Sequence, residues 1–310
     1  MSFDFSTSLG KLDLKAPVLT ASGCAAAGKE LDQFFDITLL GGIVTKSIMA
    51  QPRSGRPTPR MAETPSGMLN SIGLQGPGIQ SFIENDLEWL AKRGATTIVS
   101  IAGNNVEEFG QLAKALRNHR AVAAIEINIS CPNVANRGLV FACNPVSAAD
   151  VVAKVRQEVG QEMTLLAKLS PDVTSIVEIA DAVKTAGANG VSVINTVLGM
   201  VIDHKTLRPT LGGITGGLSG PAIRPVAVRC VYQIHAAIPD LPILGMGGIR
   251  SGLDALEFIA AGASAVSVGT ATFGDPSAPL RIQNELRDEI ESRGFSSVRE
   301  VVGIAQKGLR

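Results

Sequence analysis

The sequence predicts an α/β protein folded as a closed (β/α)₈ TIM barrel. Eight short apolar runs rich in β-branched residues recur along the 310-residue chain, and each is followed by a segment of helical period. Hydrophobic residues make up 45% of the chain but aromatic residues only 4%, a balance typical of buried parallel strands wrapped by Ala-rich helices. A doubly wound sheet seldom needs eight units, and no linker interrupts them. We therefore expect residues 1–310 to form a single barrel domain.

The expected elements alternate strictly along the chain. The strands cover residues 17–20, 42–46, 97–101, 124–129, 164–169, 190–195, 242–246 and 265–268. The helices cover residues 29–40, 81–93, 106–118, 147–159, 174–185, 223–237, 253–261 and 278–292. Side-chain and glycine signals indicate Ser147 and Thr174 as N-caps and Gly94, Gly160 and Gly187 as C-caps.

Three connections are too long for plain βα turns. They cover residues 47–80, 131–146 and 197–221, and each follows a strand, so in a barrel all three gather at the C-terminal face. Long structureless loops in one place usually cover or build a site. At the opposite end of the barrel, residues 9–14 are expected to form a small hairpin that closes the bottom.

Charge and cysteine usage exclude several classes of function. Lys plus Arg and Asp plus Glu number 28 each, so no net field favours nucleic acid or an anionic membrane surface. No signal peptide and no continuous apolar window of about 18 residues is present, which predicts a soluble cytoplasmic protein. The four cysteines lack the paired spacing of a zinc or iron–sulfur site, and we assign no metal.

Polar residues at the ends of the expected strands are the candidates for chemistry, because those ends meet over the mouth of a barrel. They are Ser22, Lys46, Ser47, Ser100, Asn128, Cys131, Lys168, Asn195, Thr196, Gly247, Gly248, Gly269 and Thr270. Glu126, inside the fourth strand, is the one carboxylate near them. Amides, two lysines and a thiol suit a planar anionic ligand better than hydrolysis by paired acids.

Two of these features have both a structural and a functional interpretation. The glycines after the last two strands lie where barrels commonly bind phosphate through backbone N–H groups, although they could simply turn the chain. Lys168 could be a paired structural lysine, a Schiff-base amine or a cation that faces an electron-rich cofactor. Spacing does not separate these three alternatives.

Cys131 lies in the most informative run, NISCPN at residues 128–133. A thiol at the mouth of the barrel, flanked by two amides and followed by a rigid proline, is placed to take a proton from a held substrate. The alternative is a small buried side chain, which is the usual state of a cysteine.

Ten motifs, in order along the chain, together resemble the class 1B dihydroorotate dehydrogenases, the catalytic subunits of an NAD-linked enzyme of pyrimidine biosynthesis. They are TASGC at 20–24, TKS at 45–47, TPR at 58–60, GMLNSIGLQ at 67–75, NISCPN, KLSP at 168–171, INT at 194–196, TGGLSG at 215–220, GMGG at 245–248 and VGT at 268–270. The resemblance runs from the first strand to the last helix.

The resemblance implies an FMN barrel that oxidises (S)-dihydroorotate to orotate in UMP synthesis. The residues implied to hold FMN are Ser22, Lys46, Ser47, Ser100, Asn128, Lys168, Ile194, Gly220, Gly247, Gly248, Gly269 and Thr270. Those implied to bind dihydroorotate are Lys46, Asn70, Ser71, Ile72, Gly73, Leu74, Asn128, Asn133, Asn195 and Thr196. Cys131 takes the family's base position, where it would remove the C5 proton while hydride passes from C6 to FMN.

The resemblance also implies a partner, because this chain has no GxGxxG fingerprint for NAD and no cysteine set for a cluster. The partner would be an electron-transfer subunit that carries FAD and a [2Fe–2S] cluster and reduces NAD⁺, with this chain as a homodimer inside a heterotetramer. One position departs from the family: Ser100 stands in VSIAG where the family usually has an asparagine that contacts the flavin.

Three other functions stay open at this point. A dihydropyrimidine dehydrogenase-like flavoprotein that acts on uracil or thymine shares the barrel, FMN and a similar cysteine loop. A Schiff-base aldolase would use Lys168, and a barrel that kept the motifs without turnover would only store flavin. Orotate carries a carboxylate that uracil lacks, so the grouping of Lys46 with residues 70–74 favours dihydroorotate.

Overall fold

The computed structural model describes residues 3–130 and 141–308, and its centre is an eight-stranded parallel sheet in the order β3-β14-β13-β10-β9-β8-β7-β4. The strands are β3 (Val18–Thr20), β4 (Ile43–Val44), β7 (Thr97–Ile101), β8 (Val122–Asn128), β9 (Thr164–Lys168), β10 (Gly190–Val193), β13 (Ile243–Met246) and β14 (Ala265–Val268). A parallel bridge between Leu19 and Gly42 joins the two end strands, and the Gly41 N–H donates to the Val18 carbonyl at 2.8 Å. The sheet therefore closes, which confirms the predicted (β/α)₈ barrel.

Aliphatic side chains fill the lower half of the barrel. Every strand of the barrel except β10 contributes to this cluster, whose fully buried members include Leu19, Val44, Ile98, Ala124, Leu166, Leu244 and Ala265. An antiparallel hairpin, β1 (Thr7–Leu9) and β2 (Leu12–Leu14), plugs the bottom with Leu9 and Leu14, as the sequence predicts. Gly10 turns this hairpin with a φ of +62°, and any Cβ there would lie 2.6 Å from the Cβ of Asn189.

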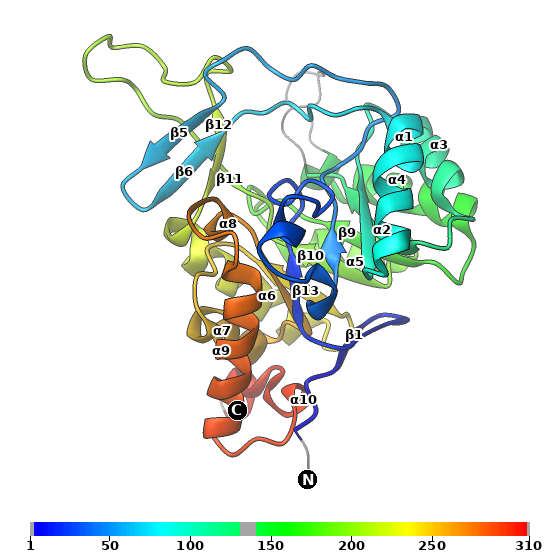
Figure 1. The fold of residues 1–310 in the computed structure, drawn as a ribbon, viewed down its shortest axis with the longest axis vertical. Helices are drawn as coiled ribbons and strands as arrows, with labels where there is room; N and C mark the ends of the chain where they lie inside the picture. The colour runs from blue at the N-terminus through cyan, green and yellow to red at the C-terminus, as the bar shows by residue number, and fades with distance from the viewer. Residues whose placement is uncertain (1–2, 131–140, 309–310) are drawn as a thin grey trace.

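Helices cover the outside of the strands, and their apolar faces form the largest buried cluster with them (Figure 1). The long helices are α3 (Val106–Leu116), α4 (Pro145–Val159), α5 (Ile176–Thr185), α6 (Arg224–Ala237), α7 (Gly252–Ala261) and α9 (Ala278–Ser292). Shorter ones are α1 (Ile79–Ser81), a π-helical segment (Phe82–Leu87), α2 (Glu88–Arg93), α8 (Ala271–Gly274) and α10 (Val298–Val301). Within the described part of the chain, no helix is both long and apolar enough to span a membrane.

The helix predicted at residues 29–40 is wrong. Two separate 3₁₀ turns, Leu31–Gln33 and Ile37–Leu39, occupy that segment. The carboxylate of Asp36 accepts from the Thr38 N–H at 2.9 Å, so the side chain offers the backbone a turn in place of a continuing helix.

Two predicted N-caps are also wrong, each by a short shift along the chain. Asn144 caps α4 by accepting from the Ser147 N–H at 3.0 Å, because Pro145 is tolerated in the first turn. Ser175 caps α5 in place of Thr174. Among the predicted C-caps, Gly94 and Gly160 are confirmed, whereas α5 ends on Ala186 and Gly187 follows it.

Two of the three long connections are not structureless. Residues 47–80 supply β5 (Met61–Thr64) and β6 (Gly67–Asn70), and residues 197–221 supply β11 (Val197–Gly199) and β12 (Gly216–Ser219). These strands form one antiparallel sheet in the order β11-β12-β6-β5, and the β5–β6 hairpin projects from one end of the barrel (Figure 1). In the third connection, residues 131–140 lie outside the described residues, and a 3₁₀ turn (Phe141–Cys143) follows them.

Candidate functional site

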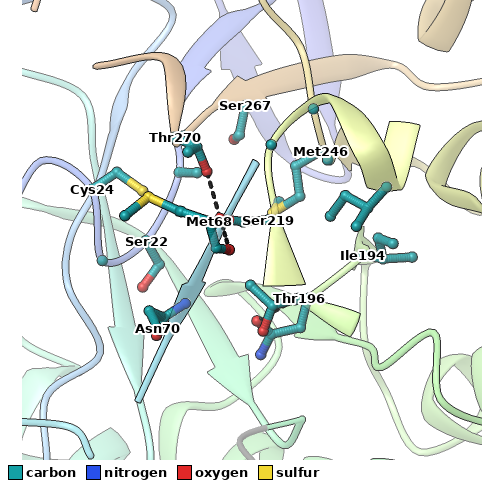
Figure 2. Close-up of a pocket in the computed structure, with 18 of the residues that line it drawn as sticks. Ser22, Cys24, Met68, Asn70, Ile194, Thr196, Ser219, Met246, Ser267 and Thr270 are labelled. Carbon is teal, nitrogen blue, oxygen red and sulfur yellow. Dashed lines mark hydrogen bonds between the residues drawn. The ribbon is translucent and has the colours of Figure 1, made fainter. Parts of the chain in front are cut away.

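A cavity of about 450 Å³ lies over the C-terminal ends of the barrel strands, and residues of β6 and β12 contribute to its wall. Its volume falls within the roughly 300–1,000 Å³ of ordinary ligand pockets. Figure 2 shows Asn70 and Thr196 toward one end and Thr270 and Ser267 toward the other. The predicted site residues in its wall are Ser22, Lys46, Ser47, Asn70, Ile72, Gly73, Leu74, Asn128, Lys168, Ile194, Asn195, Thr196, Gly220, Gly247, Gly248, Gly269 and Thr270.

Four predicted site residues are not part of this wall as the structure describes it. Cys131 and Asn133 lie outside the described residues. Ser71 is fully buried behind the wall, where its N–H donates to the Arg60 carbonyl at 2.7 Å. Ser100 is also fully buried, and its hydroxyl contacts Ser47 and Glu126 beneath the cavity wall.

A chain of hydrogen bonds connects the cavity wall to the barrel interior. The Ser100 hydroxyl donates to Glu126 Oε1 at 3.0 Å, so it is left to accept from the Ser47 hydroxyl at 2.8 Å. Ser47 Oγ in turn accepts from Asn128 Nδ2 at 2.9 Å, and the Ser22 hydroxyl oxygen lies 3.3 Å from the same Ser47 Oγ. Because each donor has a definite acceptor, the amide of Asn128 is held in one orientation at the cavity floor.

A second set of hydrogen bonds orients the other amide. Asn195 Nδ2 donates to Ser130 Oγ at 2.7 Å, and the Ser130 hydroxyl donates to Asn128 Oδ1 at 3.0 Å. The Thr196 N–H donates to Asn195 Oδ1 at 2.8 Å. Ser130, the third residue of the NISCPN run, is thus held by hydrogen bonds to both Asn128 and Asn195.

The two lysines of the cavity differ in their surroundings. Lys168 is 4% exposed, and its Nζ lies 3.7 Å from Glu126 Oε1. Lys46 has no carboxylate within 4.0 Å among the described residues, and burial, together with the nearby Arg60 guanidinium, lowers the pKa of Lys46. An anionic ligand would supply the counter-charge that Lys46 lacks, so the part of the cavity around Lys46 favours a carboxylate.

Glycines form a backbone cradle at the other end. Gly220, Gly247 and Gly248 all have positive φ, and a Cβ on Gly248 would lie 2.7 Å from the Gly220 carbonyl oxygen. Beside them, the Thr270 hydroxyl donates to Ser219 Oγ at 2.8 Å (Figure 2). A phosphate-binding loop needs backbone N–H groups that can approach the anion closely, with no side chain in between. The glycines named here lie in the loops that follow β12 and β13, and Thr270 lies in the loop that follows β14.

The cavity has further wall residues that the sequence analysis missed. Cys24, Met68 and Met246 bring sulfur atoms to it, and Ser267 contributes a hydroxyl that is buried without a partner among the described residues (Figure 2). Burial raises the pKa of the Cys24 thiol to about 11, so this thiol is protonated at neutral pH. Met68 could have been found only by recognising β6, whereas Cys24 follows the predicted Ser22 by two residues.

The other described cysteines lie apart from this chemistry. Cys143 is exposed, and its thiol donates to the Asp172 carbonyl over 3.9 Å. Cys230 is buried in α6. In residues 3–130 and 141–308, no group of three or more His, Cys, Asp or Glu side chains could hold a metal ion.

A barrel that gathers a glycine cradle, two lysines and oriented amides in one cavity at its C-terminal face has the layout of a (β/α)₈ enzyme. The sequence matches the family described as "Dihydroorotate dehydrogenase" over residues 5–290, and the chain belongs to this family.

Three curated relatives are each named "Dihydroorotate dehydrogenase B (NAD(+)), catalytic subunit". The protein from Geotalea daltonii is 48% identical over 300 residues, which cover 97% of both chains. The one from Bacillus cytotoxicus is 48% identical over 96% of this chain and 95% of its own. The one from Bacillus cereus strain B4264 is 47% identical over the same shares.

Proposed function

We propose that this chain oxidises dihydroorotate to orotate with FMN as its cofactor, as the catalytic subunit of an NAD-linked enzyme. The observation that carries the proposal is the division of one cavity into a glycine cradle at one end and an uncompensated Lys46 among oriented amides at the other. The names of near full-length relatives at 48% identity support the same reaction.

The glycine end fits FMN. Gly220, Gly247, Gly248, Gly269 and Thr270 would hold its phosphate through backbone N–H groups and a hydroxyl. The unpartnered Ser267 hydroxyl offers one more hydrogen bond inside the cavity.

Nearer the middle of the cavity, Lys168 would face the flavin ring, with Ser22, Ser47 and Ile194 around it. When bound, the flavin supplies the acceptor for the hydride that leaves the substrate. Ser100 would support this end only through Ser47, since its hydroxyl contacts Ser47 and Glu126.

The amide end fits dihydroorotate. Lys46 and the backbone of residues 70–74 would bind its carboxylate, with Ser71 supporting that segment from behind. Asn70, Asn128 and Asn195 present both N–H donors and C=O acceptors, which match the ring amides of a dihydropyrimidine. The fixed orientation of Asn128 and Asn195 would select the substrate's own donor and acceptor pattern.

Cys131 would act as the base that removes the C5 proton, with Asn133 as a further substrate contact. Support for this role comes from the NISCPN motif and from Ser130, which is held by Asn128 and Asn195 at the entrance to the loop. The carboxylate of the substrate would be fixed at Lys46, so the ring can be presented in one orientation to a thiolate on one face.

A dihydropyrimidine dehydrogenase-like activity on uracil or thymine is not favoured, because the half-buried Lys46 would then keep no counter-charge. The test compares dihydroorotate with 5,6-dihydrouracil as anaerobic reductants of the FMN-loaded chain. Dihydroorotate is expected to bleach the flavin absorbance, and dihydrouracil to leave it unchanged. Bleaching by dihydrouracil at an equal rate would contradict the proposal.

The electron-transfer partner is part of the same proposal. The partner would carry FAD and a [2Fe–2S] cluster, reduce NAD⁺ in the cytoplasm, and join a homodimer of this chain in a heterotetramer. The isolated chain is expected to pass electrons from dihydroorotate to an artificial dye but to reduce NAD⁺ negligibly until the partner is added. Robust NAD⁺ reduction by the chain alone, with partner excluded by mass spectrometry, would contradict this assignment.

A further inference from the structure

The barrel interior changes from apolar to polar directly beneath the cavity. Because side chains alternate along a strand, a residue two positions after an interior one also points inward. Ser100, Glu126, Lys168 and Ser267 each follow an interior aliphatic residue by two positions. Ser192 pairs with Lys168 on one side and with interior Leu244 on the other. These five residues form what we call the polar layer.

Glu126 is the carboxylate of the polar layer and has no place in the cavity wall. It is fully buried, and its Oε1 accepts from the Ser100 hydroxyl at 3.0 Å and lies 3.7 Å from Lys168 Nζ. Its Oε2 has no hydrogen-bond partner among the described residues. The other buried carboxylate in the described chain, Asp254, completes the capping box of helix α7 with Ser251, which is a structural role that Glu126 does not have.

Stability does not account for this arrangement. A buried ion pair is often no better than well-packed apolar residues of similar volume, although removing one partner leaves a costly unpaired charge. An aliphatic residue at 126 would extend the apolar cluster that already contains Ala124 and Leu166. What Glu126 does supply is a fixed negative charge under Lys168, whose own side chain reaches the cavity.

We propose that Glu126 is a positioning residue that holds the Lys168 ammonium at the cavity floor. Its carboxylate draws Nζ toward the barrel axis, and the Ser100 hydroxyl links the same oxygen to Ser47 and Asn128. One buried carboxylate thereby fixes a cation and an amide that face the same ligand. The inference rests on the proposed function only in taking that ligand to be flavin.

A double-mutant cycle tests whether Glu126 acts through Lys168. Glu126→Gln keeps the side-chain volume and an acceptor for Ser100 but removes the charge. In the FMN-loaded full chain, we expect Glu126→Gln to slow dihydroorotate-driven flavin reduction on the order of tenfold or more. The KM for dihydroorotate should stay unchanged, because Glu126 does not line the cavity. The visible spectrum of the bound flavin should shift in the same direction as in Lys168→Gln.

In the Lys168→Gln background, the same Glu126→Gln change should alter the rate by no more than about twofold. Additive losses in the double variant would overturn the proposal, because they would mean that Glu126 acts by packing alone. If Glu126→Gln does not fold, Glu126→Asp carries the test, since it keeps the charge but withdraws the carboxylate by one methylene. An unchanged flavin spectrum in Glu126→Asp would overturn the proposal.

Ser192→Ala is the matched control. Ser192 is fully buried in the polar layer and lies outside the cavity wall, and its hydroxyl has no hydrogen-bond partner among the described residues. We expect no change in rate, KM or spectrum, and a change as large as that of Glu126→Gln would contradict a specific role for Glu126. FMN affinities of the four cycle proteins provide a readout that needs no substrate. If the chain binds FMN but dihydroorotate does not bleach the flavin, the proposed function is contradicted. The FMN affinities still test the role of Glu126 in that case.

Discussion

The lower and upper halves of the barrel interior are built from the same strands but serve different purposes. Below, Val44, Ala124 and Leu166 belong to a dry aliphatic cluster sealed by the N-terminal hairpin. Lys46, Glu126 and Lys168 each come two residues after one of these three, further along the chain toward the cavity. The side-chain direction is the same at both levels, so a residue's distance along the strand decides whether it contributes to stability or to binding.

The largest expected effect is in the upper half, at Cys131. We predict that Cys131→Ala slows flavin reduction by dihydroorotate by roughly 10²- to 10⁴-fold, the range of general acid–base catalysis, without weakening FMN binding or lowering stability. The rate in the unsubstituted chain should rise with pH, because only the thiolate accepts the proton. Stopped-flow absorbance measures this rate, with Cys143→Ala as the control. Reduction at the unsubstituted rate would show that another group is the base.

In the lower half, substitution should act on folding alone. Leu166 is fully buried in the aliphatic cluster, and Leu166→Ala is expected to lower the free energy of unfolding by about 2–5 kcal/mol. Urea unfolding measures the loss, and the flavin reduction rate of the folded fraction should not change. Leu198→Ala, at a residue 52% exposed on β11, is the control and should stay within about 0.5 kcal/mol. Equal losses for the two variants would contradict the layered account.

The thiol of Cys24, in the cavity wall, should be unreactive at neutral pH. Its pKa is raised from 9.0 to about 11 by burial, which leaves roughly 100-fold less thiolate at pH 8 than a thiol at the reference value. We predict slow labelling by iodoacetamide, read by peptide mass spectrometry, that speeds up as the pH rises toward 11. The unfolded chain gives the reference rate, and labelling of the folded protein at that rate would refute the prediction.

The smallest effect is expected at Ser100. On the resemblance alone, restoring the family's asparagine would tighten FMN binding. Ser100 is instead enclosed beneath the cavity by Ser47 and Glu126, so Ser100→Asn should overpack the site and cost about 1–3 kcal/mol of stability. Ser100→Ala should cost less. Thermal unfolding measures the loss of stability, and an FMN titration measures the affinity for the cofactor. Tighter FMN binding by Ser100→Asn would contradict this prediction and would indicate that residue 100 contacts the flavin.

The sequence predicts the barrel well because its strands are continuous apolar runs and, in every case but the first, a helix precedes the next barrel strand. Polar residues at strand ends predict part of the cavity wall, because they share a face, and the resemblance adds residues 70, 72–74, 194 and 220. The sequence prediction fails at residues 29–40, where Asp36 forms a local turn, and at β6 and β12, which contain no β-branched or aromatic residue and so carry little strand signal. Neither the depth of Ser100 nor the link of Glu126 to Lys168 can be obtained from spacing, since both depend on the stagger between strands.

One measurement compares the two halves most directly, because Val44 and Lys46 lie two residues apart. FMN-loaded Val44→Ala and Lys46→Met are each titrated with dihydroorotate, and the bleached flavin is recorded against substrate concentration. We predict that Val44→Ala keeps the apparent affinity for dihydroorotate although it is less stable. Lys46→Met should lose affinity at least tenfold, the scale of one charge-assisted hydrogen bond, with no loss of stability because the change removes a half-buried charge that has no carboxylate partner among the described residues. Equal affinities in the two variants would contradict the account.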